Sequence, residues 1–306
     1  MSYLPEKTEN GVKIGPVELI WANNSTDFFF SNSIFIQDPE ATLVDPSANF
    51  SYFEQLASQK KVKRVLNTHY HIDHRSLNSL FRNAIFMCHE LDLPSLSSFD
   101  NYLKYADQVR NSEYIQWLQE IFSRLDIRDP YFSVTFKDGD LLPLKDQKVE
   151  IIHLPGHTPG HIGLFFHEID LLYTSDIDLT PLGPWYANIS SSIEEFQQSI
   201  QRIQKIECQY YATSHGRRVY SSEQFFQKLE RFGNAFEKRE LKILENLQKS
   251  PLSLEELSKI GIIYRKVQLD TDPLKVSFER QMIEKHLNKM TREKLIYQEK
   301  GLWHSI

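Results

Sequence analysis

The stretch that decides the fold is Thr68-His69-Tyr70-His71-Ile72-Asp73-His74, which places three imidazoles and one carboxylate within six residues. The five residues before it, with their apolar and β-branched centre, predict the end of a buried strand, so the cluster falls on a strand-to-helix turn. On such a turn His69 and His71 project in one direction, while Asp73 and His74 begin the next helix and face elsewhere. This geometry predicts ligands for two neighbouring metal ions, and we favour it over a run of ordinary surface polar residues.

Length and cysteine content bound the class of protein. A chain of 306 residues suffices for one large domain or two ordinary domains with a full hydrophobic core. Its two cysteines, Cys88 and Cys208, show no CxxC spacing, which argues against a thiolate metal site and against a disulfide framework. Any metal must therefore use histidine and carboxylate ligands.

Charge and hydropathy limit the cellular location and the classes of binding partner that we expect. The polar, acidic amino terminus and the lack of eighteen consecutive apolar residues predict a soluble cytoplasmic protein without a membrane span. A net charge of −6 argues against a protein whose whole surface binds nucleic acid. A small-molecule substrate is favoured, and nucleic acid stays the less favoured alternative.

Up to about residue 220 the chain alternates between short strands and helices. Apolar patterning predicts strands at residues 13–21, 28–37, 41–45, 133–136, 149–154, 162–166 and 171–174. A helical insertion over about residues 91–127 could act as a lid, although core packing is the simpler role for its aromatic residues. His157, Asp176 and His215 each lie in a polar turn after a strand, where ligands are commonly placed.

From Ser221 onward the pattern is helical. It predicts a helix over residues 221–249 with a break at Gly233-Asn234, a short helix capped by Ser253, a helix over residues 274–290 and a final hairpin. Three helices and a hairpin indicate a winged-helix-like unit, so we predict a catalytic domain at 1–225 and this unit at 226–306. From Asn234 onward there are 14 lysines and arginines against 11 acidic residues, a charge of +3, which leaves −9 for the remainder.

Seven side chains are candidate metal ligands: His69, His71, Asp73, His74, His157, Asp176 and His215. Nitrogen and oxygen ligands with one shared carboxylate suit a pair of borderline divalent metals that keep open positions for water. We expect zinc, with iron and manganese as alternatives, since His-rich sites accept all three. Two such ions would activate a bridging water as hydroxide and clamp the attacked oxygen, so no protein nucleophile is needed.

The motifs resemble those of the metallo-β-lactamase fold superfamily. Its signature HxHxDH stands intact at residues 69–74, and Leu43-Val44-Asp45-Pro46 resembles its first motif. His157, Asp176 and His215 match its third, fourth and fifth motifs in order, so the resemblance covers about residues 13–219. It implies an α/β (α+β) fold: an αββα sandwich of two mixed sheets with helices outside, followed here by the small helical tail.

The resemblance also implies a role for each ligand. His69, His71 and His157 would hold the first metal, Asp73, His74 and His215 the second, and Asp176 would bridge them. Asp73 and Asp176 are thereby the carboxylates assigned to catalysis. Asp45 and His161 would support the ligands from behind, unless Asp45 only caps the turn before Pro46 and His161 is an ordinary polar strand start.

Residues around the ligands must choose the substrate, because relatives of this fold hydrolyse thioesters, lactones, β-lactams, phosphodiesters and sulfates. Arg75 follows the motif where glyoxalase II and its near relatives carry a glycine-rich sequence, and we expect it to border the site. Trp185 and Tyr186 would form an apolar wall with the tyrosine hydroxyl near an attacked carbonyl, unless both plug their loop onto the core. Arg217 would bind an acidic group of the substrate, unless it only solvates its loop.

We therefore expect a dinuclear metal-dependent hydrolase of a thioester or a related carboxylic ester, in a branch that resembles hydroxyacylglutathione hydrolase. A narrow aromatic entrance fits such a substrate better than a polynucleotide. The alternatives are an endoribonuclease or phosphodiesterase, a lactonase, and a regulatory module whose tail binds DNA. For the tail we favour a simpler role, as a cover for one edge of the sandwich or as a homodimer contact.

Overall fold

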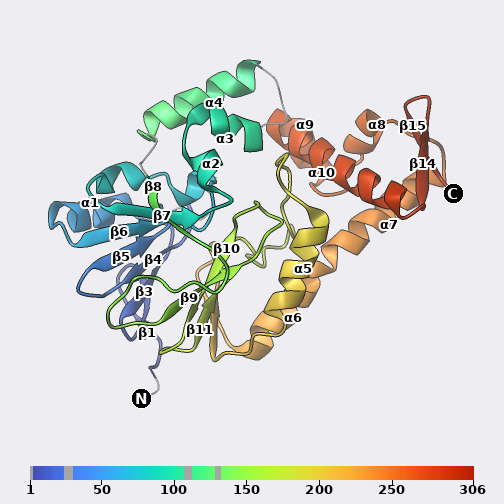
Figure 1. Cartoon of the computed structure of the whole chain (residues 1–306). Coiled ribbons are helices and arrows are strands. Elements are labelled where there is room, and N and C mark those ends of the chain that lie inside the picture. The colour runs from blue at the N-terminus through green and yellow to red at the C-terminus, as the bar shows by residue number, and fades with distance from the viewer. Residues whose placement is uncertain (1–2, 24–29, 107–111, 128–131) are drawn as a thin grey trace.

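The computed structural model describes residues 3–23, 30–106, 112–127 and 132–306. Two β-sheets lie face to face, and helices cover their outer sides (Figure 1). The αββα sandwich expected from the sequence is confirmed.

Within the described part of the chain, the first sheet has eight strands in chain order. They are β1 (Glu6–Lys7), β2 (Gly11–Ile14), β3 (Val17–Ile20), β4 (Ser33–Ile36), β5 (Ala41–Val44), β6 (Val62–Leu66), β7 (Ile85–His89) and β8 (Phe132–Phe136). The first five strands pair antiparallel, and β5 to β8 pair parallel. Parallel pairing puts the carboxyl ends of β5, β6 and β7 at one edge of the sheet. The HxHxDH motif follows β6 and so lies at that edge.

The second sheet has the order β13-β12-β11-β10-β9. Its strands are β9 (Val149–His153), β10 (Ile162–Phe166), β11 (Leu171–Tyr173), β12 (Tyr210–Ala212) and β13 (Val219–Tyr220). β11 and β12 pair parallel, while the other neighbours are antiparallel. Two loops that carry predicted ligands, after β11 and after β12, therefore leave the sheet at the same edge.

The helices of the first 220 residues cover the sheets. They are α1 (Phe50–Ser58), η1 (Ile72–His74), η2 (Asn78–Phe81), α2 (Leu93–Leu96), α3 (Phe99–Ala106), α4 (Ser112–Arg124) and α5 (Ile193–Ile203). α5 illustrates why these segments are helical: the Ser192 hydroxyl caps its amino terminus, and Phe196, Ile200 and Ile203 recur on one buried face.

Three apolar layers hold the sandwich together. The middle layer joins both sheets through residues such as Val44, Leu66, Leu164 and Leu171. A second layer lies between the first sheet and the helices α1, α3 and α4. The third lies between the second sheet and the helices that follow it, and it extends into the carboxyl-terminal region. On β5 both faces are buried, because Leu43 enters the second layer and its neighbour Val44 enters the middle layer.

One predicted strand is wrong, and another begins outside the residues that the structure describes. Residues 13–21 form the hairpin β2–β3 rather than one strand, because Gly15 takes a φ of +56° and turns the chain. The strand predicted from Phe28 begins at residues 28 and 29, which lie outside the described residues, and β4 begins at Ser33.

The carboxyl-terminal region contains α6 (Ser222–Gly233), α7 (Ala235–Leu247), α8 (Leu254–Ser258), α9 (Lys266–Thr271), α10 (Pro273–Arg292) and the hairpin β14 (Ile296–Glu299) and β15 (Leu302–Ser305). The break at Gly233-Asn234 and the capping box of Ser253 with Glu256 are confirmed, whereas α9 was not expected.

The carboxyl-terminal helices are packed on two sides. On α10, Phe278 and Met282 join the layer that covers the second sheet, while Ile283 and Leu287 join a separate core with the final hairpin. The predicted domain boundary after residue 225 falls inside α6, and the division into two domains stays a prediction. No described helix is both long and apolar enough to cross a membrane.

Candidate metal centre

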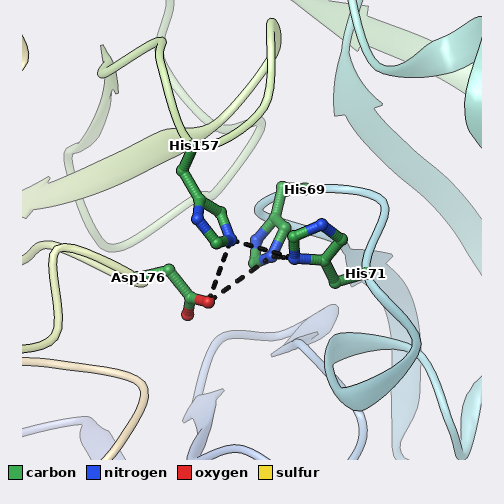
Figure 2. A group of neighbouring side chains, drawn as sticks. All are labelled: His69, His71, His157 and Asp176. Carbon is green, nitrogen blue, oxygen red and sulfur yellow. Dashed lines mark hydrogen bonds and ion pairs between the residues drawn. The ribbon is translucent and has the colours of Figure 1, made fainter. Parts of the chain in front are cut away.

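His69, His71, His157 and Asp176 form the first ligand group. His71 Nδ1 lies 3.0 Å from His69 Nε2 and 2.9 Å from His157 Nε2. Asp176 Oδ2 lies 3.1 Å from His157 Nε2 and 3.8 Å from His69 Nε2. Figure 2 shows the three rings and the carboxylate converging on one point from the loops after β6, β9 and β11. Four ligand atoms that meet from separate strand ends are the arrangement a bound cation requires.

Asp73, His74 and His215 form the second ligand group. Asp73 Oδ2 lies 3.6 Å from His74 Nε2 and 3.5 Å from His215 Nε2. Asp176 Oδ1 reaches this group too, at 3.0 Å from His74 Nε2 and 3.7 Å from His215 Nε2. The structure thus brings all seven sequence-predicted ligands together, with Asp176 between the two groups.

The donor set fits a pair of divalent cations. His74 Nε2 is buried and makes no hydrogen bond of regular geometry to a described residue, while the carboxylate oxygens of Asp176 and Asp73 face it at 3.0 and 3.6 Å, as expected for a nitrogen that shares a metal with them. Burial, together with the neighbouring imidazoles, lowers the pKa of His69 and of His71 well below the ordinary value. Both rings are therefore neutral, which is the form that coordinates metals.

Asp176 is ionised in spite of its burial. Burial by itself would raise its pKa, but the imidazole of His74 and that of His157, whose Nε2 lies 3.1 Å away, hold the pKa of this carboxyl well below its usual range. A carboxylate with one oxygen toward each group can serve both cations.

Asp45 lies behind His74. Its Oδ2 lies 2.8 Å from His74 Nδ1 and accepts the Thr68 hydroxyl at 2.6 Å, and its Oδ1 accepts the Thr68 N–H at 2.7 Å. A carboxylate on Nδ1 keeps the proton there and leaves Nε2 free to face the group. These contacts support the predicted role of Asp45, in addition to any role in the turn before Pro46.

His161 lies behind Asp176. Its Nδ1 donates to the Leu154 carbonyl at 2.8 Å, so its Nε2 can accept the Asp176 backbone N–H at 3.0 Å. Burial, with His157 nearby, lowers the pKa of His161 to about 3, which keeps the ring neutral and its Nε2 an acceptor. His161 thereby fixes the backbone of the carboxylate that faces both groups.

Trp185 and Tyr186, although adjacent, face different surroundings. The Trp185 ring centroid lies 5.4 Å from that of His71 and 5.8 Å from that of His157, so its side chain borders the first group. Tyr186 is fully buried, and its hydroxyl contacts His286 Nε2 at 2.6 Å and Arg239 at 2.7 Å. The structure contradicts the expected contact of this hydroxyl with a substrate, because the carboxyl-terminal helices cover it.

Arg75 is also buried, which argues against the predicted contact with a substrate. Its guanidinium lies 5.6 Å from the ring centroid of Tyr102 and 5.2 Å from that of Phe122, beneath α3 and α4. Arg217 is exposed and donates to the carbonyl oxygens of Ala22 and Asn23, and its role in binding stays a prediction.

Two polar residues at the site were not predicted from the sequence. Asp92, after β7, is fully buried, and its carboxylate accepts the Tyr70 N–H at 3.1 Å, the Thr158 hydroxyl at 2.7 Å and the Gly160 N–H at 2.6 Å. It ties the two loops that carry the first group. Burial raises its pKa to about 6. The only sequence signal is an acidic residue soon after a buried strand.

The second of these residues is Asn188, which no sequence motif marks as part of the site. Its side-chain amide lies 2.8 Å from the Tyr70 hydroxyl and 2.5 Å from His71 Nε2. It is buried against the ring of a predicted ligand, 117 positions away in the chain.

Comparison with known proteins places these motifs in one family. A family model described as "Metallo-beta-lactamase superfamily" matches residues 26–215. The chain is 29% identical over 157 residues to hydroxyacylglutathione hydrolase GloC of Haemophilus influenzae. This alignment covers 49% of this chain and 67% of that protein. It is 24% identical over 217 residues to the atrochrysone carboxyl ACP thioesterase of Aspergillus fumigatus. This second alignment covers 69% of this chain and 58% of that protein.

The fold extends further than these alignments. The metallo-beta-lactamase family protein TTHA1429 from Thermus thermophilus superposes with a TM-score of 0.70, at 18% identity, over 95% of this chain and 99% of that one. At this identity the likeness concerns the fold alone. It includes the carboxyl-terminal helices, since only 5% of this chain lies outside the match.

Proposed function

The chain belongs to the metallo-beta-lactamase superfamily, and from that premise we propose that it is a metal-dependent hydrolase of a small thioester or a related carboxylic ester. The observation that carries this proposal is the convergence of seven ligand-type side chains, with Asp176 facing both groups. His69, His71 and His157 would hold one divalent cation, and Asp73, His74 and His215 would hold another. We propose zinc for both positions.

The chemistry would divide between the cations and the chain. When bound, a pair of divalent ions lowers the pKa of water and polarises the oxygen of a carbonyl group. Hydrolysis adds water across the acyl bond, so that a carboxylic acid and a thiol or an alcohol leave. Asp73, whose side chain is 16% exposed, would hold the proton that this water releases.

The surroundings support an acyl substrate. The Trp185 ring beside His71 and His157 gives one side of the site an apolar wall, which excludes water and fits an acyl chain. The names of the two relatives, a hydroxyacylglutathione hydrolase and an acyl carrier protein thioesterase, describe substrates of this chemical class. The net charge of −6 is unfavourable to a polynucleotide.

A substrate panel tests the proposal. S-lactoylglutathione, an acyl-coenzyme A, a lactone and single-stranded RNA are incubated with the purified chain, with and without chelator. We expect chelator-sensitive hydrolysis of one of the thioesters and none of the RNA. Hydrolysis of RNA alone would replace the proposal with a phosphodiesterase, and hydrolysis of the lactone alone would replace it with a lactonase.

A further inference from the structure

The segment from Leu182 to Asn188 touches the first ligand group from behind. The Trp185 carbonyl oxygen accepts a hydrogen bond from His157 Nδ1 at 2.8 Å. Asn188 lies against His71 Nε2 at 2.5 Å, while His71 Nδ1 faces the other ligands. The outer ring nitrogens of two of the three histidines thus contact one short segment. At His157 the carbonyl acceptor keeps the proton on Nδ1 and leaves the inner Nε2 free of a proton, and at His71 the same result requires the amide oxygen of Asn188 to face Nε2.

Arg239 on α7 anchors this segment. The side chain is 3% exposed, and its Nη1 donates to the Pro184 carbonyl at 2.8 Å and contacts the Tyr186 hydroxyl at 2.7 Å. Its Nη2 donates to the Leu182 carbonyl at 2.6 Å. A guanidinium is a rigid planar fork with several donors, so these contacts fix the direction of the segment as well as its distance from α7.

Close packing leaves the segment little freedom to move. Gly183 has a φ of +82°, and a Cβ at this position would lie 2.6 Å from Ala235 Cβ and 3.3 Å from Arg239 Nη2. A side chain cannot be accommodated there without displacing α7. The backbone of the segment is therefore pressed directly onto the helix that carries Arg239.

Two further contacts come from the carboxyl-terminal region, one from the loop between α8 and α9 and one from α10. The Trp185 indole N–H donates to the Tyr264 hydroxyl at 3.0 Å, and the Tyr186 hydroxyl contacts His286 Nε2 at 2.6 Å. His286 Nδ1 lies 3.1 Å from Glu240, so the chain of contacts continues into α7 and α10. Every one of these partners lies beyond the region that the family model matches.

We propose that Arg239 is a positioning residue of the first metal site: by fixing the segment 182–188 it sets the orientation and the tautomer of His71 and His157. The inference rests on the proposed function in so far as these histidines hold a metal ion. It gives the carboxyl-terminal helices a role in the metal site, in addition to any role in covering the sandwich.

Asn188 has a defined part in this arrangement. If His71 binds a cation through Nδ1, its Nε2 carries the proton and needs an acceptor. The amide nitrogen now points at Nε2, and a half-turn of the amide places Oδ1 there without moving other atoms. The Tyr70 hydroxyl can then donate to the same oxygen. An aspartate can supply this oxygen and a leucine cannot.

The test measures metal affinity, with no substrate present. Full-length wild type, Arg239→Met, Arg239→Lys, Asn188→Leu and Asn188→Asp are stripped, loaded with Co²⁺ and titrated against a competing chelator, with the visible absorption recorded at each step. The matched control is Leu287→Ala, a truncation in the separate core of the carboxyl-terminal helices that does not contact residues 182–188.

We expect Arg239→Met and Asn188→Leu to weaken one of two Co²⁺ ions by about 10–100-fold and to change its absorption, with the other ion unaffected. Arg239→Lys and Asn188→Asp should retain part of the affinity, and Leu287→Ala should match wild type.

Wild-type affinities and spectra in Arg239→Met and Asn188→Leu would overturn the inference and leave the proposed function standing. Wild type that binds no Co²⁺ would overturn both. If Arg239→Met does not fold, Arg239→Lys and Asn188→Leu decide in the same way.

Discussion

The two ligand groups differ in how firmly their histidines are held. In the first group every outer nitrogen has a partner: Thr68 for His69, Asn188 for His71 and the Trp185 carbonyl for His157. Because the Thr68 hydroxyl gives its proton to Asp45, its oxygen can accept from His69 Nδ1.

The second group is more open. His74 is buried and held by Asp45, but the side chains of Asp73 and His215 are 16% and 29% exposed. No hydrogen bond to His215 Nδ1 occurs among the residues the structure describes. The difference teaches that the histidines of the first group are fixed by the surrounding protein, whereas the second group is the side that is more open to solvent.

Replacing Asp176 should have the largest effect, because this carboxylate is shared by both groups. We expect Asp176→Ala to lose both metal ions, and to lose more activity than the roughly 100-fold upper value for residues that only support ligands. Metal content and thioester turnover are measured together on folded protein. Undiminished turnover would contradict the comparison, since neither ligand group would then be needed for hydrolysis.

Single replacements in the two groups should separate them. His215→Ala should lose one metal ion and keep the other near its wild-type affinity, because the first group does not use this residue. His71→Ala should lose the tightly held ion instead. Chelator titration of both variants checks this order, and equal losses in the two variants would show that the groups are not distinct.

Asp92→Asn tests how the loops of the first group are tied. An amide offers one acceptor oxygen, so one of the N–H groups of Tyr70 and Gly160 would face an NH₂ group. We expect the free energy of unfolding to fall by about 1–3 kcal/mol. Denaturant unfolding in excess chelator measures it, with Asp45→Asn, behind the second group, as the parallel variant. An unchanged free energy of unfolding in Asp92→Asn would show that these hydrogen bonds of Asp92 do not stabilise the two loops.

A smaller effect should appear in the pH dependence of the free energy of unfolding, through His89 behind the first ligand group. His89 stacks on His153 with ring centroids 4.1 Å apart, and His153 Nε2 donates to the Pro159 carbonyl in the loop of His157. Burial, with His153 nearby, lowers the pKa of His89 to about 4. Between pH 6.5 and 4 the unfolded chain therefore binds more protons at this residue than the folded chain, so its contribution to stability is lost as pH falls.

The difference between wild type and His89→Asn isolates this contribution. We expect wild type to lose on the order of 1 kcal/mol more than the variant across that pH window, after allowance for solvent screening. Unfolding is followed in chelator at several pH values, so that the ligand histidines cancel in the difference. Parallel curves for the two proteins would refute the assignment.

Much of this site was predictable from the sequence, for a local reason. His69, His71, His157, Asp176 and His215 each follow a short strand closely, so the strand pattern that places the ends of the sheets also brings these residues together. The alternation of apolar residues fits the two-sheet sandwich, which the resemblance to the superfamily implied.

The surroundings were not predictable in this way. Whether Arg75 and Tyr186 face a substrate depends on α3, α4 and the carboxyl-terminal helices, which bury both side chains. Asn188 meets His71 across 117 positions, and no periodicity in a single sequence encodes such a contact. The β2–β3 turn at Gly15 was missed because an apolar run hides a two-residue turn.

The most direct test of the central claim is a titration of metal-free protein with Zn²⁺, in which thioester hydrolysis is measured at each addition. We expect no hydrolysis before metal is added and a rise that saturates at two equivalents, since seven ligands in two groups serve two ions. Full hydrolysis by protein that analysis shows to be free of metal would contradict the account.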